Sequence, residues 1–343
     1  MFLTSTVLVT RAPVIGVPIV KNSTMRDHAV VSAGHAYPVD TRSPEPDDAE
    51  WRGVGYRVGL MTFAVLLVLV PAVALFPGGG RSALTEGLRG GFTTTDLVLF
   101  VVVALVAATI KGFSGFGYAL IATPLATLLI DPTAAVVVLA IPPLMLNLFQ
   151  VGETGTGPSY LRQHWPLVVC ALVGSAVGVY FLSSVPRSPI IPVLIGLLLL
   201  GYVVWQLIRR FLPAPAAAHP LALGVVGTAE GFLLGAVNIG PLLPAYLHTF
   251  ERNARRYIGG MSLVFSLVFA ERIVQMFGNG LMSPYRLWLG SVIALITLVG
   301  LLAGTALRRS RWVNERAFTT IVVVLLAATG ITILVRAVPQ LVG

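Results

Sequence analysis

Charged side chains are scarce in this sequence. Among its 343 residues, 11% are charged and 56% are hydrophobic, whereas a soluble domain carries about 25% charged and about 45–50% apolar residues. So few charges cannot cover the surface of a water-soluble globule of this size. The composition excludes an ordinary soluble enzyme and predicts an all-α integral membrane protein.

Cysteine and metal-ligand patterns are also nearly absent. The one cysteine, Cys170, cannot form an internal disulfide or supply a four-thiolate metal site. The histidines at 28, 35, 164, 219 and 248 are scattered without the spacing of metal ligands. We therefore expect no metal site and no cofactor. A Walker-type phosphate loop is missing too, so the sequence does not support direct use of ATP.

Long apolar runs occupy most of the chain after its first 57 residues. Residues 1–57 contain no run long enough to span a membrane, and we predict a disordered cytoplasmic tail. Residues 58–76 are uncharged and just long enough to cross a hydrocarbon core of about 30 Å, so they predict an extra N-terminal transmembrane helix. The rest divides into ten apolar segments in two sets of five, over 96–210 and 218–338.

The two sets have the same order of long and short segments. Each begins with a segment ending in glycines, followed by a short segment with proline, 116–130 in the first set and 239–249 in the second. Because a crossing helix needs about 17 residues, these short segments predict re-entrant or broken helices. Because each set has an odd number of segments, the second set enters the membrane from the face opposite to the first. The pattern therefore predicts two inverted repeats, a feature of transporters.

Basic residues predict the orientation. The net charge is +9, and placing the tail inside puts eleven basic loop residues on the cytoplasmic side against five on the other. Because Lys and Arg concentrate in cytoplasmic loops, we expect a cytoplasmic N-terminus. This use of the charge is favoured over nucleic-acid binding.

Two glycine-rich turns are the first candidates for a binding site. The first, KGFSGFGYALIATPL at 111–125, contains Gly112, Ser114, Gly115 and Gly117; the second, GFLLGAVNIGPLLPAY at 231–246, contains Asn238 and Gly240. Such turns leave backbone N–H groups free for an anion, and half-helix N-termini add positive partial charge. We expect the two turns to face each other across a central site. Close helix packing through small residues is the alternative for the glycines.

Ionisable residues inside apolar segments are the next candidates, because such groups are costly in a membrane. Lys111 either balances an anionic substrate or extends to the headgroups. Glu230 either carries a proton, since burial favours the neutral form of a carboxyl, or pairs with Lys111 or Arg272. Arg272 is a candidate anion contact. Asn147 and Gln150 follow Pro142 and Pro143, which are expected to kink their segment, and either line the pathway or link helices.

The first glycine motif, followed by Asp131 and Pro132, resembles the TauE/SafE sulfite exporter family over roughly 96–338. In the second motif, Asn238 interrupts a glycine run that is usually denser in that family. The resemblance implies two related repeats and transport of small sulfur-containing anions across the inner membrane.

We therefore predict a secondary transporter of a small anion, with one repeat rocking against the other. Its expected partners are a small anionic solute and membrane lipid; a passive anion channel or an intramembrane enzyme is the alternative. No Ser, His and carboxylate converge in the sequence, so an enzyme is not predicted. The predicted substrate-binding residues are Lys111, Gly112, Ser114, Gly115, Gly117, Asn147, Gln150, Asn238, Gly240 and Arg272, with Glu230 as the proton-coupling group.

Overall fold

Helices build the described part of this protein. A computed structural model describes residues 53–78, 94–185, 188–208, 220–247, 251, 253–310 and 315–342, and these ranges contain no strand. Within them, eight helical spans are long and apolar enough to cross a membrane. The predicted all-α membrane fold is confirmed. The predicted tail up to residue 52, and loop arginines such as Arg81, Arg89, Arg187, Arg209, Arg210, Arg252 and Arg311, lie outside the described residues.

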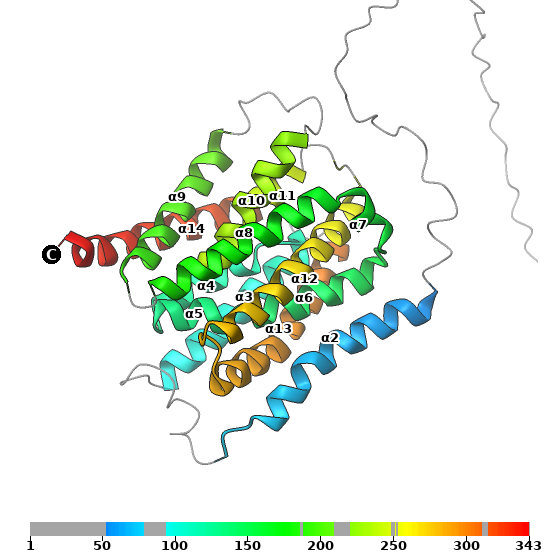
Figure 1. Ribbon diagram of the computed structural model, residues 1–343, viewed down its shortest axis with the longest axis horizontal. Coiled ribbons are helices and arrows are strands. Elements are labelled where there is room, and N and C mark those ends of the chain that lie inside the picture. Colours follow the sequence, from blue (N-terminus) through cyan, green and yellow to red (C-terminus); the bar gives the residue numbers. More distant parts are fainter. Residues whose placement is uncertain are drawn as a thin grey trace, which may run out of the picture. The chain divides into compact units, whose positions relative to one another are not determined.

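The first half of the protein contains eight described helices, which Figure 1 labels in chain order. They are α2 (Val54–Ala74), α3 (Thr94–Ser114), α4 (Tyr118–Thr127), α5 (Pro132–Val138), α6 (Ile141–Thr154), α7 (Ser159–Gln163), α8 (Trp165–Ser184) and α9 (Ile190–Ile208). Helix α2 corresponds to the extra N-terminal helix, which begins four residues before the predicted start at 58.

The second half contains α10 (Pro220–Val237), α11 (Leu242–Leu247), α12 (Ala254–Gly278), α13 (Pro284–Ser310) and α14 (Glu315–Val342). Helix α4 has 10 residues and α11 has 6, so at 1.5 Å per residue each reaches about 15 Å or less, far short of a bilayer core. Both short helices occur where the sequence predicts them.

Glycine and asparagine produce the two breaks that precede these short helices. Between α3 and α4, Gly115 and Gly117 have φ of 88° and 97°, a left-handed conformation that glycine adopts without steric cost. Between α10 and α11, Asn238 takes φ of 61°, and asparagine is among the few other residues that tolerate this region.

A third break divides the segment predicted over 133–152. Asp131 caps α5 by accepting a hydrogen bond from the Ala134 N–H at 3.0 Å, and α5 ends at Val138. Helix α6 restarts at Ile141, with proline at its N-terminus. Pro142 and Pro143 have no N–H to continue the hydrogen bonding of α5, so the expected kink takes the form of a two-residue break at Leu139 and Ala140 within one apolar span.

Glycines bring two pairs of helices into backbone contact. A Cβ placed on Gly112 of α3 overlaps the Leu301 backbone oxygen of α13, and one placed on Gly231 of α10 overlaps the Ala171 oxygen of α8. Figure 1 shows α8 and α10 side by side. Small residues allow this approach, as in other membrane helix pairs. We call the two contacts the α3–α13 seam and the α8–α10 seam.

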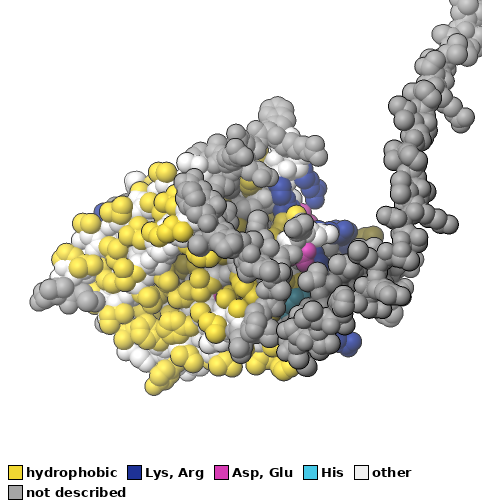
Figure 2. Space-filling view, turned by 90° about the horizontal axis from the view of Figure 1, so that it is seen from above, with side chains coloured by type: hydrophobic (Ala, Val, Ile, Leu, Met, Phe, Trp, Pro, Cys, Tyr) yellow, Lys and Arg dark blue, Asp and Glu magenta, His cyan; other side chains and the backbone are white. Residues whose placement is uncertain are grey.

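The seams join the two predicted repeats reciprocally. Helix α3 of the first set packs against α13 of the second, and α10 of the second set packs against α8 of the first. In addition, α6 packs on α12 and α9 packs on α14. A twofold relation between the sets produces such an exchange of partners, although the inverted repeat itself stays a prediction. Figure 2 shows hydrophobic side chains over much of the visible surface, with Lys and Arg gathered mostly toward one end.

Candidate functional site

Lys111 lies in the last turn of α3 and is buried, with 3% of its surface exposed. Its Nζ donates to Asn147 Oδ1 of α6 at 2.7 Å and to the Gly115 carbonyl oxygen at 3.3 Å. The side chain therefore stays inside the protein, and the alternative in which it extends to the headgroups is wrong. An ammonium group has three protons, so two of its three donors are directed to these partners.

Asn147 and Gln150 share one face of α6, because residues three apart on a helix are neighbours. The Gln150 Oε1 accepts a hydrogen bond from Ser262 Oγ of α12 at 3.1 Å. Its Nε2 is buried and has no hydrogen-bond partner among the described residues. Both amides thus link helices, as the alternative account held, and Gln150 retains a donor. Lys111, Asn147, Gln150 and Ser262 form what we call the lysine cluster.

The first glycine turn supplies the backbone of this cluster. The Gly115 carbonyl faces Lys111 Nζ, while Gly115 N–H donates to the Lys111 carbonyl at 2.7 Å. The Ser114 hydroxyl lies 2.8 Å from each of two backbone oxygens, those of Ile110 and Phe116. Gly112 belongs to the α3–α13 seam, so it packs helices, whereas Gly115 and Gly117 make the turn.

Asn238 organises a second group of buried polar residues. Its Nδ2 donates to Thr123 Oγ1 of α4 at 2.8 Å and to the Leu139 carbonyl at 2.9 Å. Its Oδ1 accepts from Arg272 Nη1 of α12. The amide that was predicted to contact an anion is thus bonded to the first half of the protein. Through Asn238, the break between α10 and α11 is bonded to α4 and to the break between α5 and α6.

Arg272 completes this arginine cluster, which consists of Arg272, Asn238 and Thr123. Its guanidinium is fully buried, donates to the Val136 carbonyl at 3.3 Å and lies 5.9 Å from the centre of the Phe269 ring. Its Nε has no hydrogen-bond partner within the described ranges. A buried cation with a free donor is well suited to meet an anion.

Glu230 of α10 is fully buried close to the same break. Its Oε2 accepts a hydrogen bond from the Leu242 N–H at 2.8 Å, at the start of α11. Gly240 lies against the carboxyl, because a Cβ there would come within 2.5 Å of Oε1. The described hydrogen bonds of Lys111 and Arg272 go to other groups. The Glu230 carboxyl therefore bonds to the second break and does not form the ion pair that was its alternative role.

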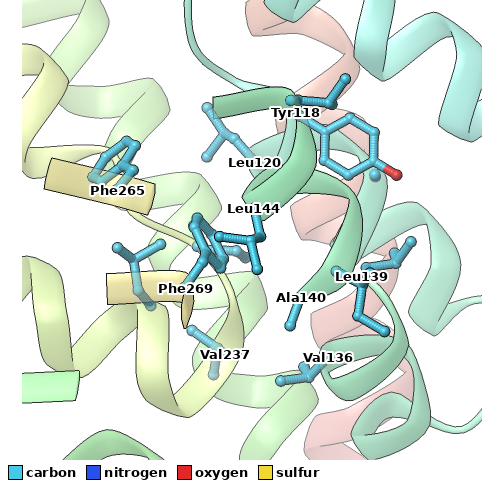
Figure 3. Close-up of a cluster of buried hydrophobic side chains, with 14 of the residues drawn as sticks. Tyr118, Leu120, Val136, Leu139, Ala140, Leu144, Val237, Phe265 and Phe269 are labelled. Carbon is cyan, nitrogen blue, oxygen red and sulfur yellow. The ribbon is translucent and has the colours of Figure 1, made fainter. Parts of the chain in front are cut away.

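An apolar layer separates the lysine cluster from the arginine cluster. On α12, Ser262, Phe265, Phe269 and Arg272 follow one another at intervals of three and four residues, which places them along one face. On α6, Leu144 lies between Asn147 of the lysine cluster and the α5–α6 break, where the Leu139 carbonyl binds Asn238 of the arginine cluster. Figure 3 shows Phe269 beside Leu144, with Phe265 and Tyr118 toward opposite sides of the view, and all four are buried.

The predicted site residues therefore occupy two places instead of one. On α12, Ser262 of the lysine cluster and Arg272 of the arginine cluster are ten positions apart, or about 15 Å along the helix. Sequence reasoning missed Ser262 and the two phenylalanines. The spacing of Ser262, Phe265, Phe269 and Arg272 at intervals of three and four is the signal that could have identified them.

This is a multi-pass helical membrane protein in which several helices are interrupted near buried charged side chains. Such interrupted helices are typical of membrane transporters. The family model described as sulfite exporter TauE/SafE matches residues 100–333. The chain therefore belongs to the TauE/SafE sulfite exporter family, a family of membrane transporters. The resemblance seen in the first motif is confirmed. Searches of curated proteins and of solved structures found no match. Helix α2 precedes the matched residues.

Proposed function

We propose that this protein is a secondary transporter that moves sulfite, a sulfonate or a related small anion across the inner membrane by alternating access. The observation that carries the proposal is the stacking of two buried cationic clusters on either side of an apolar layer. A hydrated anion cannot cross such a layer at low cost, so the layer has to shift for a solute to pass.

The lysine cluster is the proposed primary binding site. Lys111 supplies a positive charge and a third proton, and Gln150 supplies its free Nε2. Together they offer two donors from different helices to the oxygens of one oxyanion. Hydrogen bonds between an ionised donor and an ionised acceptor are about twice as strong as neutral ones. The glycine turn at Gly115 and Gly117 lets the backbone approach this position closely.

The arginine cluster is the proposed second contact along the pathway. Arg272 has a free Nε, and its other described bonds tie Asn238 to Val136. An anion at Nε would therefore touch the group that joins the α10–α11 break to the α5–α6 break. This connection supports the proposal that substrate binding and helix movement are linked.

The seams favour a different movement from the predicted rocking of one repeat against the other. A rocking motion of one whole repeat against the other separates both the α3–α13 seam and the α8–α10 seam, where backbones touch. We propose instead that each seam moves as a unit and that α6 and α12 shift between them. The moving bodies then contain helices from both repeats.

Counterflow in proteoliposomes tests the proposed transport and its binding site. Vesicles preloaded with unlabelled sulfite should take up labelled sulfite faster than empty vesicles, and Lys111→Met or Gln150→Leu should reduce this uptake about tenfold or more. One charged hydrogen bond contributes about 1.5–3 kcal/mol. Gln206→Leu in α9 is the control, because it removes the same amide outside the clusters.

Two results contradict the proposal. Equal uptake by the wild type and both cluster variants contradicts the site. Uptake that is not accelerated by internal sulfite, accompanied by single-channel currents, contradicts a carrier and supports the passive channel.

A further inference from the structure

A cavity opens between α2, α6 and α13, and its lining residues belong to neither cluster. Its volume is about 560 Å³, within the range of about 300–1,000 Å³ that is typical of small-molecule sites. Met61 of α2, Phe149 of α6, and Leu302 and Ala306 of α13 form an apolar wall. The other part of the lining is polar and consists of Glu153, Thr305, Arg309 and Ser310. The cavity is thus amphipathic.

Arginines surround the neighbouring end of α6. Arg57 of α2 donates to the Gly152 carbonyl at 3.2 Å, and Arg255 of α12 donates to the Thr154 carbonyl at 2.7 Å. Arg308 and Arg309 lie 3.8 and 3.2 Å from Glu153 Oε1.

Two of these arginines lie near the Glu153 carboxylate and two bind main-chain carbonyls, so the end of α6 carries an excess of positive charge. The Nη1 of Arg308 is buried and has no hydrogen-bond partner in the described ranges. Figure 2 shows Lys and Arg side chains gathered mostly at one end of the molecule, next to a broad hydrophobic surface.

We propose that this cavity binds an anionic phospholipid. Its phosphate would pair with Arg309, while an acyl chain would lie along Met61, Phe149 and Leu302. Basic pockets between membrane helices recognise anionic headgroups in this way. The apolar wall has no use for free phosphate, and the positive excess disfavours a neutral lipid. The inference concerns a site apart from both clusters and does not depend on the transported solute.

Lipid binding to the purified full chain tests the inference. Native mass spectrometry and thermal unfolding in detergent compare phosphatidylglycerol, phosphatidylcholine and the soluble headgroup glycerol phosphate. We expect phosphatidylglycerol alone to remain bound and to raise the melting temperature. Arg309→Gln should weaken its binding about fivefold, because one basic side chain near an anionic lipid contributes about 1 kcal/mol.

Two further variants separate the chain from the charge. Ala306→Trp fills the cavity from an exposed position, so it should fold normally and lose most of the bound phosphatidylglycerol. Arg162→Gln removes the same charge from α7 and should bind as the wild type does. Equal binding by all variants, equal stabilisation by phosphatidylcholine, or stabilisation by glycerol phosphate alone overturns the proposal.

Discussion

Glu230 links a titratable group directly to the shape of the main chain. Its Oε2 accepts from the Leu242 N–H at the first residue of α11, and Gly240 leaves room for the carboxyl. A hydrogen bond to an ionised carboxylate is stronger than one to a neutral acid. Proton uptake by Glu230 would therefore loosen the start of α11, which supports the prediction that this residue couples protons to transport.

Replacing Glu230 by Gln tests this coupling, because the amide keeps the size of the side chain and cannot titrate. If protons drive transport, wild-type sulfite uptake into proteoliposomes should respond to an imposed pH gradient. The Glu230→Gln variant should show the same uptake with and without the gradient. Glu271→Gln, in the half-buried neighbour of Arg272, is the control and should keep the response. A Glu230→Gln variant that still responds to the gradient excludes Glu230 as the coupling group.

The two seams determine how tolerant a helix is of added bulk. Gly231→Ala puts a Cβ into the Ala171 carbonyl across the α8–α10 seam, whereas Gly201→Ala in α9 meets nothing within 4 Å. Overpacking costs about 1–3 kcal/mol, so Gly231→Ala should lower the melting temperature in detergent. Gly201→Ala should change stability by about 0.5 kcal/mol or less. Equal melting temperatures for the two variants contradict the contact.

The elements differ in how far the sequence predicts them. The short helices were predictable, because Gly115 and Gly117 interrupt the first apolar run, and Gly240 and Pro241 interrupt the second. The α5–α6 interruption was expected only as a kink, since the effect of Pro142 and Pro143 depends on where neighbouring helices satisfy the freed carbonyls. The Leu139 carbonyl, for example, is bonded by Asn238, 99 positions away.

The pairing of polar residues was less predictable than the residues themselves. Lys111, Asn147, Asn238 and Arg272 were all candidates because polar groups in apolar runs are rare. Whether Lys111 meets Asn147 or Glu230 depends on which helices are neighbours, and one sequence does not contain that information. The separation into two clusters followed only from the packing of α6 against α12.

At the scale of the whole molecule, the basic residues predict an orientation that cysteine labelling can check. In a Cys170→Ser background, single cysteines replace Ser310, at the end of α13, or Ser188, before α9. The positive-inside rule places Ser310 in the cytoplasm and Ser188 on the opposite side. A membrane-impermeant maleimide should therefore label Ser188→Cys in intact cells and Ser310→Cys only after lysis. The reverse pattern contradicts a cytoplasmic N-terminus.

The position of α2 has a consequence for biosynthesis. Helix α2 packs on α6 and α13, yet α13 begins 210 positions after α2 ends. At about 5–20 residues per second, the ribosome needs roughly 10 to 40 s to make that stretch. During this time α2 lies in the bilayer without one of its two main partners, so its docking is a late event of folding, and a chain that stops before α13 leaves it incompletely assembled.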